Sequence, residues 1–217
     1  MITAIFDLDG TIADTIKDLA DAVNYGLRQL NCPEHSVENY KQLVGNGARK
    51  LCIRALPDDR KNDSDKLYEF FREYYGSHYL DSTTIYSGIK EVMERLSKKG
   101  VKIAVATNKP QDTARKLISH LLPDIEFVKV LGGCDSRPKK PDTAIIREIL
   151  SEIPDKDNTV YMIGDSNVDI QTAKNSGLIS IGCLWGFRSR EELEAEGADH
   201  IAEKTSDIAD IILGCAI

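Results

Sequence analysis

The chain has little positive charge, no clustered cysteines and no long apolar run. Its 217 residues carry 28 Lys and Arg against 35 Asp and Glu, a formal net charge of −7. Binding to nucleic acid needs a basic face that neutralises backbone phosphates, so this balance argues against a nucleic-acid partner. No apolar segment approaches the ~20 residues that span a bilayer, and no basic stretch precedes an apolar run at the N-terminus. We therefore expect a cytoplasmic protein with no membrane partner.

The cysteines are scattered along the chain, and none stands in a C-x-x-C pair. An odd number without clustering is typical of reduced thiols rather than of a disulfide framework or a zinc site. Free cysteine usually behaves as a small hydrophobic residue, so we expect these side chains to be buried. They are Cys32, Cys52, Cys134, Cys183 and Cys215.

Short apolar runs alternate with helical periodicity from about residue 88 onward. This alternation predicts right-handed βαβ units and a parallel sheet. The opening run Ile2–Phe6 belongs to the same sheet, because it too is short and continuously apolar. The later strands are expected at 101–106, 125–131, 159–163 and 179–184, and the helices at 89–96, 110–121, 142–150, 167–176 and 206–213.

The segment 15–83 contains no convincing strand, and its apolar residues recur at helical spacing. We therefore expect an α/β core formed by residues 1–14 and 84–217, with a Rossmann-like parallel sheet. Residues 15–83 would form a helical cap domain that is inserted after the first strand. The helices expected in this cap cover 16–30, 51–56 and 67–79.

Polar residues stand where three of the predicted strands end, and in one further loop. Each has a simple local explanation: an Asp before Gly is usually a turn residue, Thr-Asn before Pro can be an N-cap, and a lysine pair is usually solvated. The carboxyl ends of parallel strands meet at one sheet edge, however, and several acids gathered there would repel unless a cation neutralised them. The residues concerned are Asp7, Asp9, Thr107, Asn108, Lys140, Asp165 and Asp169.

This set of residues would suit phosphoryl transfer. Asp7 can act as a covalent nucleophile and form an aspartyl-phosphate, and Asp9 can protonate the leaving alcohol and then activate water. Mg²⁺ held by Asp7 and Asp165 would neutralise charge between the nucleophile and a phosphate anion. Lys140 and the Thr107 hydroxyl would bind the phosphoryl oxygens in the transition state. The expected partner is thus a small anionic phosphate ester.

These motifs resemble those of the haloacid dehalogenase-like superfamily of phosphatases, over nearly the whole chain. The resemblance implies a nucleophile at Asp7 and a general acid/base at Asp9, whose backbone carbonyl also binds Mg²⁺. It also implies a metal ligand at Asp165, with Asp169 supporting the metal site from outside the coordination sphere or through water. Phosphoryl binding would fall to Thr107, Asn108 and Lys140. The four motifs are Asp7-Leu8-Asp9-Gly10-Thr11, Thr107-Asn108, Lys140-Pro141 and Gly164-Asp165-Ser166-Asn167-Val168-Asp169.

Within this superfamily the segments Thr107–Pro110, Val44–Ala48 and Trp185–Arg188 resemble those of the phosphoglycolate phosphatases. Pyrophosphatases and sugar phosphatases share parts of these segments, so both remain alternatives. In the cap, a glycine-rich turn can bring backbone N–H groups close to an anion, and an arginine could grip a second carboxylate or phosphate. A plain helix–helix turn with a surface arginine is the alternative. The candidates for substrate recognition are Gly45, Asn46, Gly47 and Arg49.

Three other functions use related residues. A receiver-like signalling module also carries a phospho-Asp, but the insertion at 15–83 and the second acid, Asp9, oppose it. A phosphomutase would return the phosphoryl group to a sugar and release no free phosphate. Dehalogenation needs no metal and would leave Asp165 unexplained. The sequence does not indicate the oligomeric state.

Overall fold

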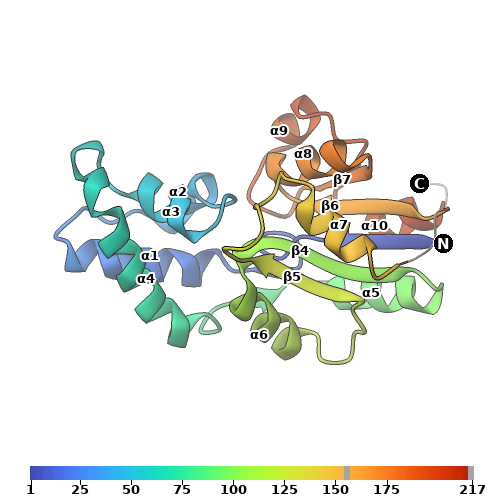
Figure 1. The fold of residues 1–217 in the computed structure, drawn as a ribbon, viewed down its shortest axis with the longest axis horizontal. Helices are drawn as coiled ribbons and strands as arrows, with labels where there is room; N and C mark the ends of the chain where they lie inside the picture. The colour runs from blue at the N-terminus through green and yellow to red at the C-terminus, as the bar shows by residue number, and fades with distance from the viewer. Residues whose placement is uncertain (154–156, 215–217) are drawn as a thin grey trace.

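The computed structural model describes residues 1–153 and 157–214, which contain a six-stranded, fully parallel sheet (Figure 1). The strand order is β5-β4-β1-β6-β7-β8, so β1 lies between β4 and β6 near the middle of the sheet. The carboxyl ends of the central strands point toward a separate group of helices (Figure 1). The strands are β1 (Ile2–Phe6), β4 (Lys102–Pro110), β5 (Lys129–Gly133), β6 (Thr159–Gly164), β7 (Ile179–Cys183) and β8 (His200–Ala202).

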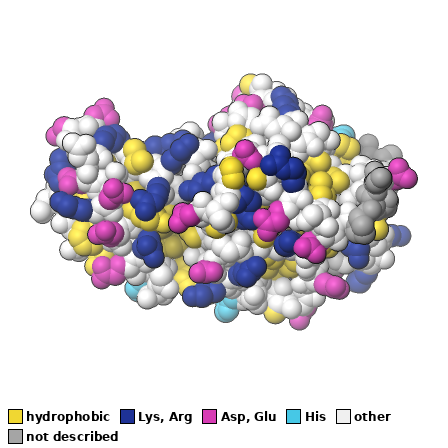
Figure 2. All heavy atoms as spheres, viewed as in Figure 1, with side chains coloured by type: hydrophobic (Ala, Val, Ile, Leu, Met, Phe, Trp, Pro, Cys, Tyr) yellow, Lys and Arg dark blue, Asp and Glu magenta, His cyan; other side chains and the backbone are white. Residues whose placement is uncertain are grey.

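This separate group, here called the helical lobe, lies within residues 15–83. It has its own hydrophobic cluster, to which the rest of the chain contributes Phe187. The molecular surface is hollowed between the lobe and the sheet, and Lys and Arg side chains lie on both sides of the hollow (Figure 2). The lobe contains α1 (Ile16–Gln29), α2 (Val37–Leu43), α3 (Ala48–Ala55), the 3₁₀ helix η1 (Asp58–Asp63) and α4 (Ser64–His78).

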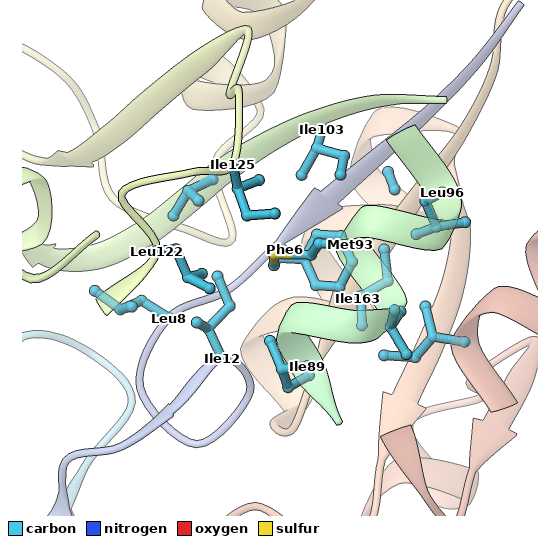
Figure 3. Packing of buried hydrophobic residues seen from close by; sticks show 14 of the residues in the cluster. Phe6, Leu8, Ile12, Ile89, Met93, Leu96, Ile103, Leu122, Ile125 and Ile163 are labelled. Carbon is cyan, nitrogen blue, oxygen red and sulfur yellow. The ribbon is translucent and has the colours of Figure 1, made fainter. Parts of the chain in front are cut away.

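The two faces of the sheet are covered by different helices. Successive side chains of a strand point to opposite faces, so Phe6 packs in the cluster with α5, α6 and α10, whereas Ile5 packs in the cluster with α7 and α8. Figure 3 shows Phe6 lying against Met93 of α5, with Ile163 of β6 nearby. The helices are α5 (Ile89–Lys98), α6 (Gln111–Leu121), α7 (Ala144–Leu150), α8 (Asn167–Ser176), α9 (Arg190–Ala195) and α10 (Thr205–Leu213).

The two connections between the lobe and the sheet lie side by side. The incoming segment β2 (Ala13–Asp14) pairs antiparallel with the outgoing segment β3 (Thr84–Ile85). Just inside the lobe, the buried carboxylate of Asp18 accepts hydrogen bonds from the backbone N–H groups of Ser82 and Thr83, at 2.9 Å each, and from the Thr83 hydroxyl at 2.7 Å. The segments that enter and leave the lobe are therefore held against each other.

The predicted α/β class and parallel sheet are confirmed, and the structure corrects several boundaries. β5 begins at Lys129 and not at Ile125, because Ile125 fills the core from the loop after α6 without joining the sheet. β4 continues to Pro110, so α6 begins one residue later than expected. The sequence analysis did not predict η1, the short pair β2 and β3, or the elements α2, α9 and β8.

Two expectations from the composition can be compared with the structure. Of the four described cysteines, all free, three are buried, but Cys134 is partly exposed and corrects the expectation of burial; Cys215 lies outside the described residues. None of the described helices is long and apolar enough to cross a membrane.

Candidate active site

The candidate site lies where the strand order reverses direction. From β1 the chain first adds β4 and β5 on one side and then returns to add β6 on the other, and ligands of open α/β sheets bind at such a point. A cavity of about 40 Å³ lies here between the sheet and the lobe. Its lining includes Asp7, Asp9, Thr107 and Asp165 from the core, and Tyr75 from the lobe.

A tight turn after β1 places the first acidic residues. The carbonyl of Leu8 accepts the N–H groups of Thr11, Ile12 and Ala13 at 3.0–3.3 Å, which folds the chain back directly after Asp7. Gly10 has φ +81°, and a Cβ there would lie 2.3 Å from Asp165 Oδ2. Only glycine allows this turn to approach the second acidic strand end so closely.

Three buried carboxylates meet at the floor of the cavity. Oxygen atoms of Asp7, Asp165 and Asp169 all lie within 4.8 Å of one another. Asp165 accepts hydrogen bonds from the Thr11 hydroxyl at 3.2 Å and from the backbone N–H of Phe187 at 2.8 Å. Burial, and then repulsion from Asp169 and Asp7, raises the pKa of Asp165 well above its ordinary value. Burial likewise raises the pKa of Asp7, to about 6, although Lys140 opposes the shift.

Lys140 is the cation among these acids. Its side chain is 1% exposed, and its Nζ lies 2.6 Å from Asp169 Oδ1 and 3.0 Å from Asp7 Oδ1. Asp169 also accepts hydrogen bonds from the backbone and hydroxyl of Ser166 at the start of α8. Lys140 and Ser166 thus hold Asp169 on both of its oxygens.

The donor set fits a divalent cation with oxygen ligands. Asp7 Oδ1 is buried and has no well-aligned hydrogen bond within the described chain, although Lys140 lies near it. Lys140 pairs with Asp7 and Asp169 but not with Asp165, so the three carboxylates keep an excess of negative charge when ionised. Mg²⁺ prefers such carboxylate oxygens. A cation held here would give the unsatisfied Asp7 oxygen a partner and offset the negative charge of the cluster.

A second buried ion pair lies beside this cluster and was not predicted from the sequence. Lys109 Nζ lies 2.8 Å from Asp9 Oδ1 and donates to the Tyr75 hydroxyl of the lobe at 2.7 Å. Asp9 Oδ1 also accepts from the Thr15 hydroxyl at 2.8 Å. Lys109 follows Thr107-Asn108 directly and belongs to the segment Thr107–Pro110 that the sequence analysis singled out, and this position was the sequence signal for it. The structure adds that Lys109 lines the cavity. Asp9 is therefore held from both the core and the lobe.

The polar pair at the end of β4 has two different surroundings. Thr107 is buried and lines the cavity. The amide of Asn108 accepts from the backbone N–H of Lys140 at 2.9 Å and donates to the carbonyls of Lys140 and Gly45, at 3.1 and 3.2 Å. The side chain of Asn108 is thus occupied in joining the loop of Lys140 to the lobe.

Of the four lobe residues predicted to recognise the substrate, two line the cavity and two have other surroundings. Gly45 and Gly47 line the cavity. Asn46 instead accepts a hydrogen bond from Arg54. Arg49 is exposed, pairs with Asp65 at 2.9 Å and lines the adjoining groove between lobe and core, but not this cavity. Asn46 and Arg49 thus have partners within the lobe, and contact of either side chain with the ligand stays a prediction.

A family comparison agrees with this geometry. The profile of the family described as haloacid dehalogenase-like hydrolase matches residues 4–183, which include both the sheet and the lobe. The chain belongs to this family. The resemblance stated from the motifs is thereby confirmed, and family membership makes the chain an enzyme of the hydrolase class rather than a signalling module.

Individual members of the haloacid dehalogenase-like family match over nearly the whole chain. A phosphoglycolate phosphatase from Vibrio parahaemolyticus is 32% identical, covering 95% of this chain and 94% of the relative. One from Aquifex aeolicus is 31% identical, covering 98% and 97%. A crystal structure from Lactobacillus delbrueckii subsp. bulgaricus, provisionally named phosphoglycolate phosphatase, superposes with a TM-score of 0.92 at 32% identity, covering 98% of both chains.

Proposed function

We propose that this haloacid dehalogenase-like hydrolase is a Mg²⁺-dependent phosphatase. It would hydrolyse a small phosphate monoester through a phosphorylated Asp7, and phosphoglycolate is the first substrate to test. The observation that carries the proposal is the buried cluster of Asp7, Asp165 and Asp169 with Lys140, next to Asp9 at one cavity. The relatives named phosphoglycolate phosphatase support the choice of substrate.

The chain's own residues would carry two steps. In the first, a carboxylate oxygen of Asp7 forms a bond to phosphorus while the bond to the leaving oxygen breaks, and Asp9 gives that oxygen its proton. In the second, Asp9 takes a proton from water as the water oxygen attacks the phosphorus, which frees phosphate and the Asp7 carboxylate. Lys109 and Thr15 hold Asp9 in place for both proton transfers.

The carboxylates of Asp7 and Asp165, with the backbone carbonyl of Asp9, would hold Mg²⁺, and Asp169 would support the site through Lys140 or water. When bound, the ion would neutralise charge between the phosphate and the acidic cluster. Lys140 and the hydroxyl of Thr107 would bind phosphoryl oxygens. Asn108 would contribute by fixing the loop that carries Lys140.

The helical lobe would act as a cap that covers the substrate and excludes water. Its α4 contributes Tyr75 to the cavity, and its loop between α2 and α3 contributes Gly45 and Gly47. A leaving group that enters this cavity would meet the lobe at these residues. Backbone N–H groups of the glycine-rich turn are the candidates for contact with that group.

The experiment measures phosphate release from a panel of small phosphate esters and pyrophosphate. Wild type and Asp7→Asn are each assayed with Mg²⁺ and with chelator, and Asp124→Asn, an exposed change beside Lys90, serves as the control. We expect release that needs both Mg²⁺ and Asp7, that is unchanged in the control, and that is strongest for one ester.

Asp9→Asn should slow turnover and let phosphorylated Asp7 accumulate, which mass spectrometry of the intact protein would detect. Full activity in Asp7→Asn would overturn the nucleophile assignment. Transfer of phosphate between sugars without release would indicate a phosphomutase, and preference for pyrophosphate or a sugar phosphate would replace the proposed substrate.

A further inference from the structure

The segment Trp185–Arg188, here called the strap, follows β7 and contacts the acidic cluster and the lobe. The indole N–H of Trp185 donates to the carbonyl of Thr11 at 3.1 Å, next to the turn that carries Asp7. Gly186 packs so closely on Asp165 that a Cβ there would lie 2.2 Å from the Asp165 Cβ. The backbone N–H of Phe187 donates to Asp165 Oδ2 at 2.8 Å. One end of the strap is thus fixed to the residues proposed to bind the cation.

The other end of the strap reaches the lobe. The Phe187 side chain is buried in the lobe's hydrophobic cluster. Arg188 donates from Nη1 to the carbonyl of Lys41 and from Nη2 to the carbonyl of Val44 at 2.8 Å. Its Nε lies 3.2 Å from Glu192 of α9, and its side chain is 8% exposed. The core therefore holds the lobe at this point through a buried, multiply bonded arginine.

The carbonyls that Arg188 binds belong to the last turn of α2 and the residue that follows it. The last carbonyls of a helix have no partner within the helix, and a cation beside them is favourable. The loop that leaves this helix end, Val44–Gly47, carries the two glycines at the cavity wall. Both glycines have positive φ, 125° at Gly45 and 85° at Gly47, and lie outside any helix or strand. Asn108 holds the loop at the Gly45 carbonyl and Arg54 at the Asn46 side chain, so Arg188 adds the hold at the end of α2, where the loop begins.

We infer that Arg188 is a positioning residue that holds the loop Val44–Gly47 over the cavity, with the strap as its link to Asp165. Arg188 does not touch the reacting atoms. It binds the end of α2, and the loop follows from that end. Because neighbouring Phe187 binds Asp165, the position of the loop is tied to the acidic cluster on which the chemistry depends. The inference rests on the proposed phosphatase function for its kinetic test, but not for its structural test.

The structural test compares amide hydrogen exchange, followed by mass spectrometry, in wild type, Arg188→Ala, Arg188→Lys and Arg190→Ala. Arg190 is the matched control, because it is two residues away from Arg188 and pairs with Glu194 and Glu203, which both lie in the core. We expect Arg188→Ala to speed exchange about tenfold in peptides that cover 41–51, and not in α1, α4 or the sheet. Arg188→Lys keeps the charge and one donor nitrogen but loses the planar fork that reaches both carbonyls, so it should show a smaller change, and Arg190→Ala none.

The kinetic test uses the best ester from the phosphate-release panel. Loss of hydrogen bonds from a charged donor should raise KM about tenfold in Arg188→Ala, with kcat changed less than about threefold, because Asp7 and Asp9 stay in place. Exchange and KM equal to wild type in Arg188→Ala would overturn the inference. So would faster exchange throughout the lobe, which would make Arg188 a general stabiliser. If wild type released no phosphate at all, the proposed function would fail, and the exchange experiment would still decide the role of Arg188.

Discussion

Replacing Asp165 by asparagine should make the metal-free protein more stable and abolish its response to Mg²⁺. Asp165 is 2% exposed, and one of its oxygens lies within 4.8 Å of an oxygen of Asp7 and an oxygen of Asp169. No ion pair joins Asp165 to a cation among the described residues, whereas Lys140 pairs with both other acids. At 4.8 Å and an effective dielectric constant of about 20, two ionised carboxylates repel by about 3.5 kcal/mol.

The free energy of unfolding should therefore rise by about 2 kcal/mol in Asp165→Asn without metal, since partial protonation already relieves part of this repulsion. For a chain of this size that corresponds to a Tm about 4–8 °C higher. The size of this gain depends on pH. Because the pKa of Asp165 is raised in the folded state, ionisation opposes folding, so the gain should be present at neutral pH and vanish below the unfolded pKa of about 3.9.

Differential scanning calorimetry in chelator and in Mg²⁺ checks both parts. Wild type should gain about 2.7 kcal/mol at a Mg²⁺ concentration 100-fold above Kd, and Asp165→Asn should gain little. Asp199→Asn is the control, with an expected effect of opposite sign on Tm. Hydrogen bonds from Ser180 lower the pKa of Asp199, so loss of this charge should not stabilise the folded protein. A lower Tm for Asp165→Asn in chelator, or a full response to Mg²⁺, would refute the reasoning.

Three further substitutions test other parts of the structure. Lys109→Met should lower kcat by about tenfold or more, because Asp9 loses a buried charged hydrogen bond; unchanged steady-state kinetics would contradict this role. Asp18→Ala should lower the free energy of unfolding by about 2–4 kcal/mol, because N–H groups at the lobe connection, including that of Thr83, lose their acceptor; urea unfolding measures this, and a loss below about 1 kcal/mol would count against it. Arg49→Ala should change KM less than about twofold and stability by less than about 1 kcal/mol, since its ion pair is exposed; a large rise in KM would instead support the role in substrate binding predicted from the sequence.

The grouping of Asp7, Asp165 and Asp169 could be predicted because it depends on local rules. Each acid follows a short apolar strand or opens the next helix, and parallel strands bring their carboxyl ends to one edge. Neither the turn geometry nor the side-chain positions had to be known. The structure accordingly places these three residues within reach of one cation.

Lys109 could not be assigned in the same way, because its surroundings are assembled from distant segments. A lysine before proline at a strand end resembles an exposed residue in the sequence. It is buried only because Tyr75, on a helix of the lobe, closes over it while Asp9 supplies the opposite charge. The same holds for Arg188, whose partners on the lobe lie more than 140 residues away.

The predicted boundaries of helices and strands were wrong where the local sequence pattern was ambiguous. Ile125 is apolar and buried, and an apolar run of this length predicts a strand even when the chain packs against the core without pairing. The edge strand β8 has only three residues, His200–Ala202, and its first residue is exposed. It forms because β7 offers a free edge, which is a property of the assembled sheet and not of this segment.

The paired segments β2 and β3 have a consequence for how such enzymes can diversify. Because the chain leaves the sheet and returns to it at adjacent points, the lobe is attached as an insertion whose ends already meet, and insertions of this kind are tolerated best. A different set of helices could be grafted between Asp14 and Thr84 without altering the order or register of the six strands. Selectivity could then be exchanged as a unit, provided that the new helices offer carbonyl groups for Arg188 and a hydroxyl for Lys109.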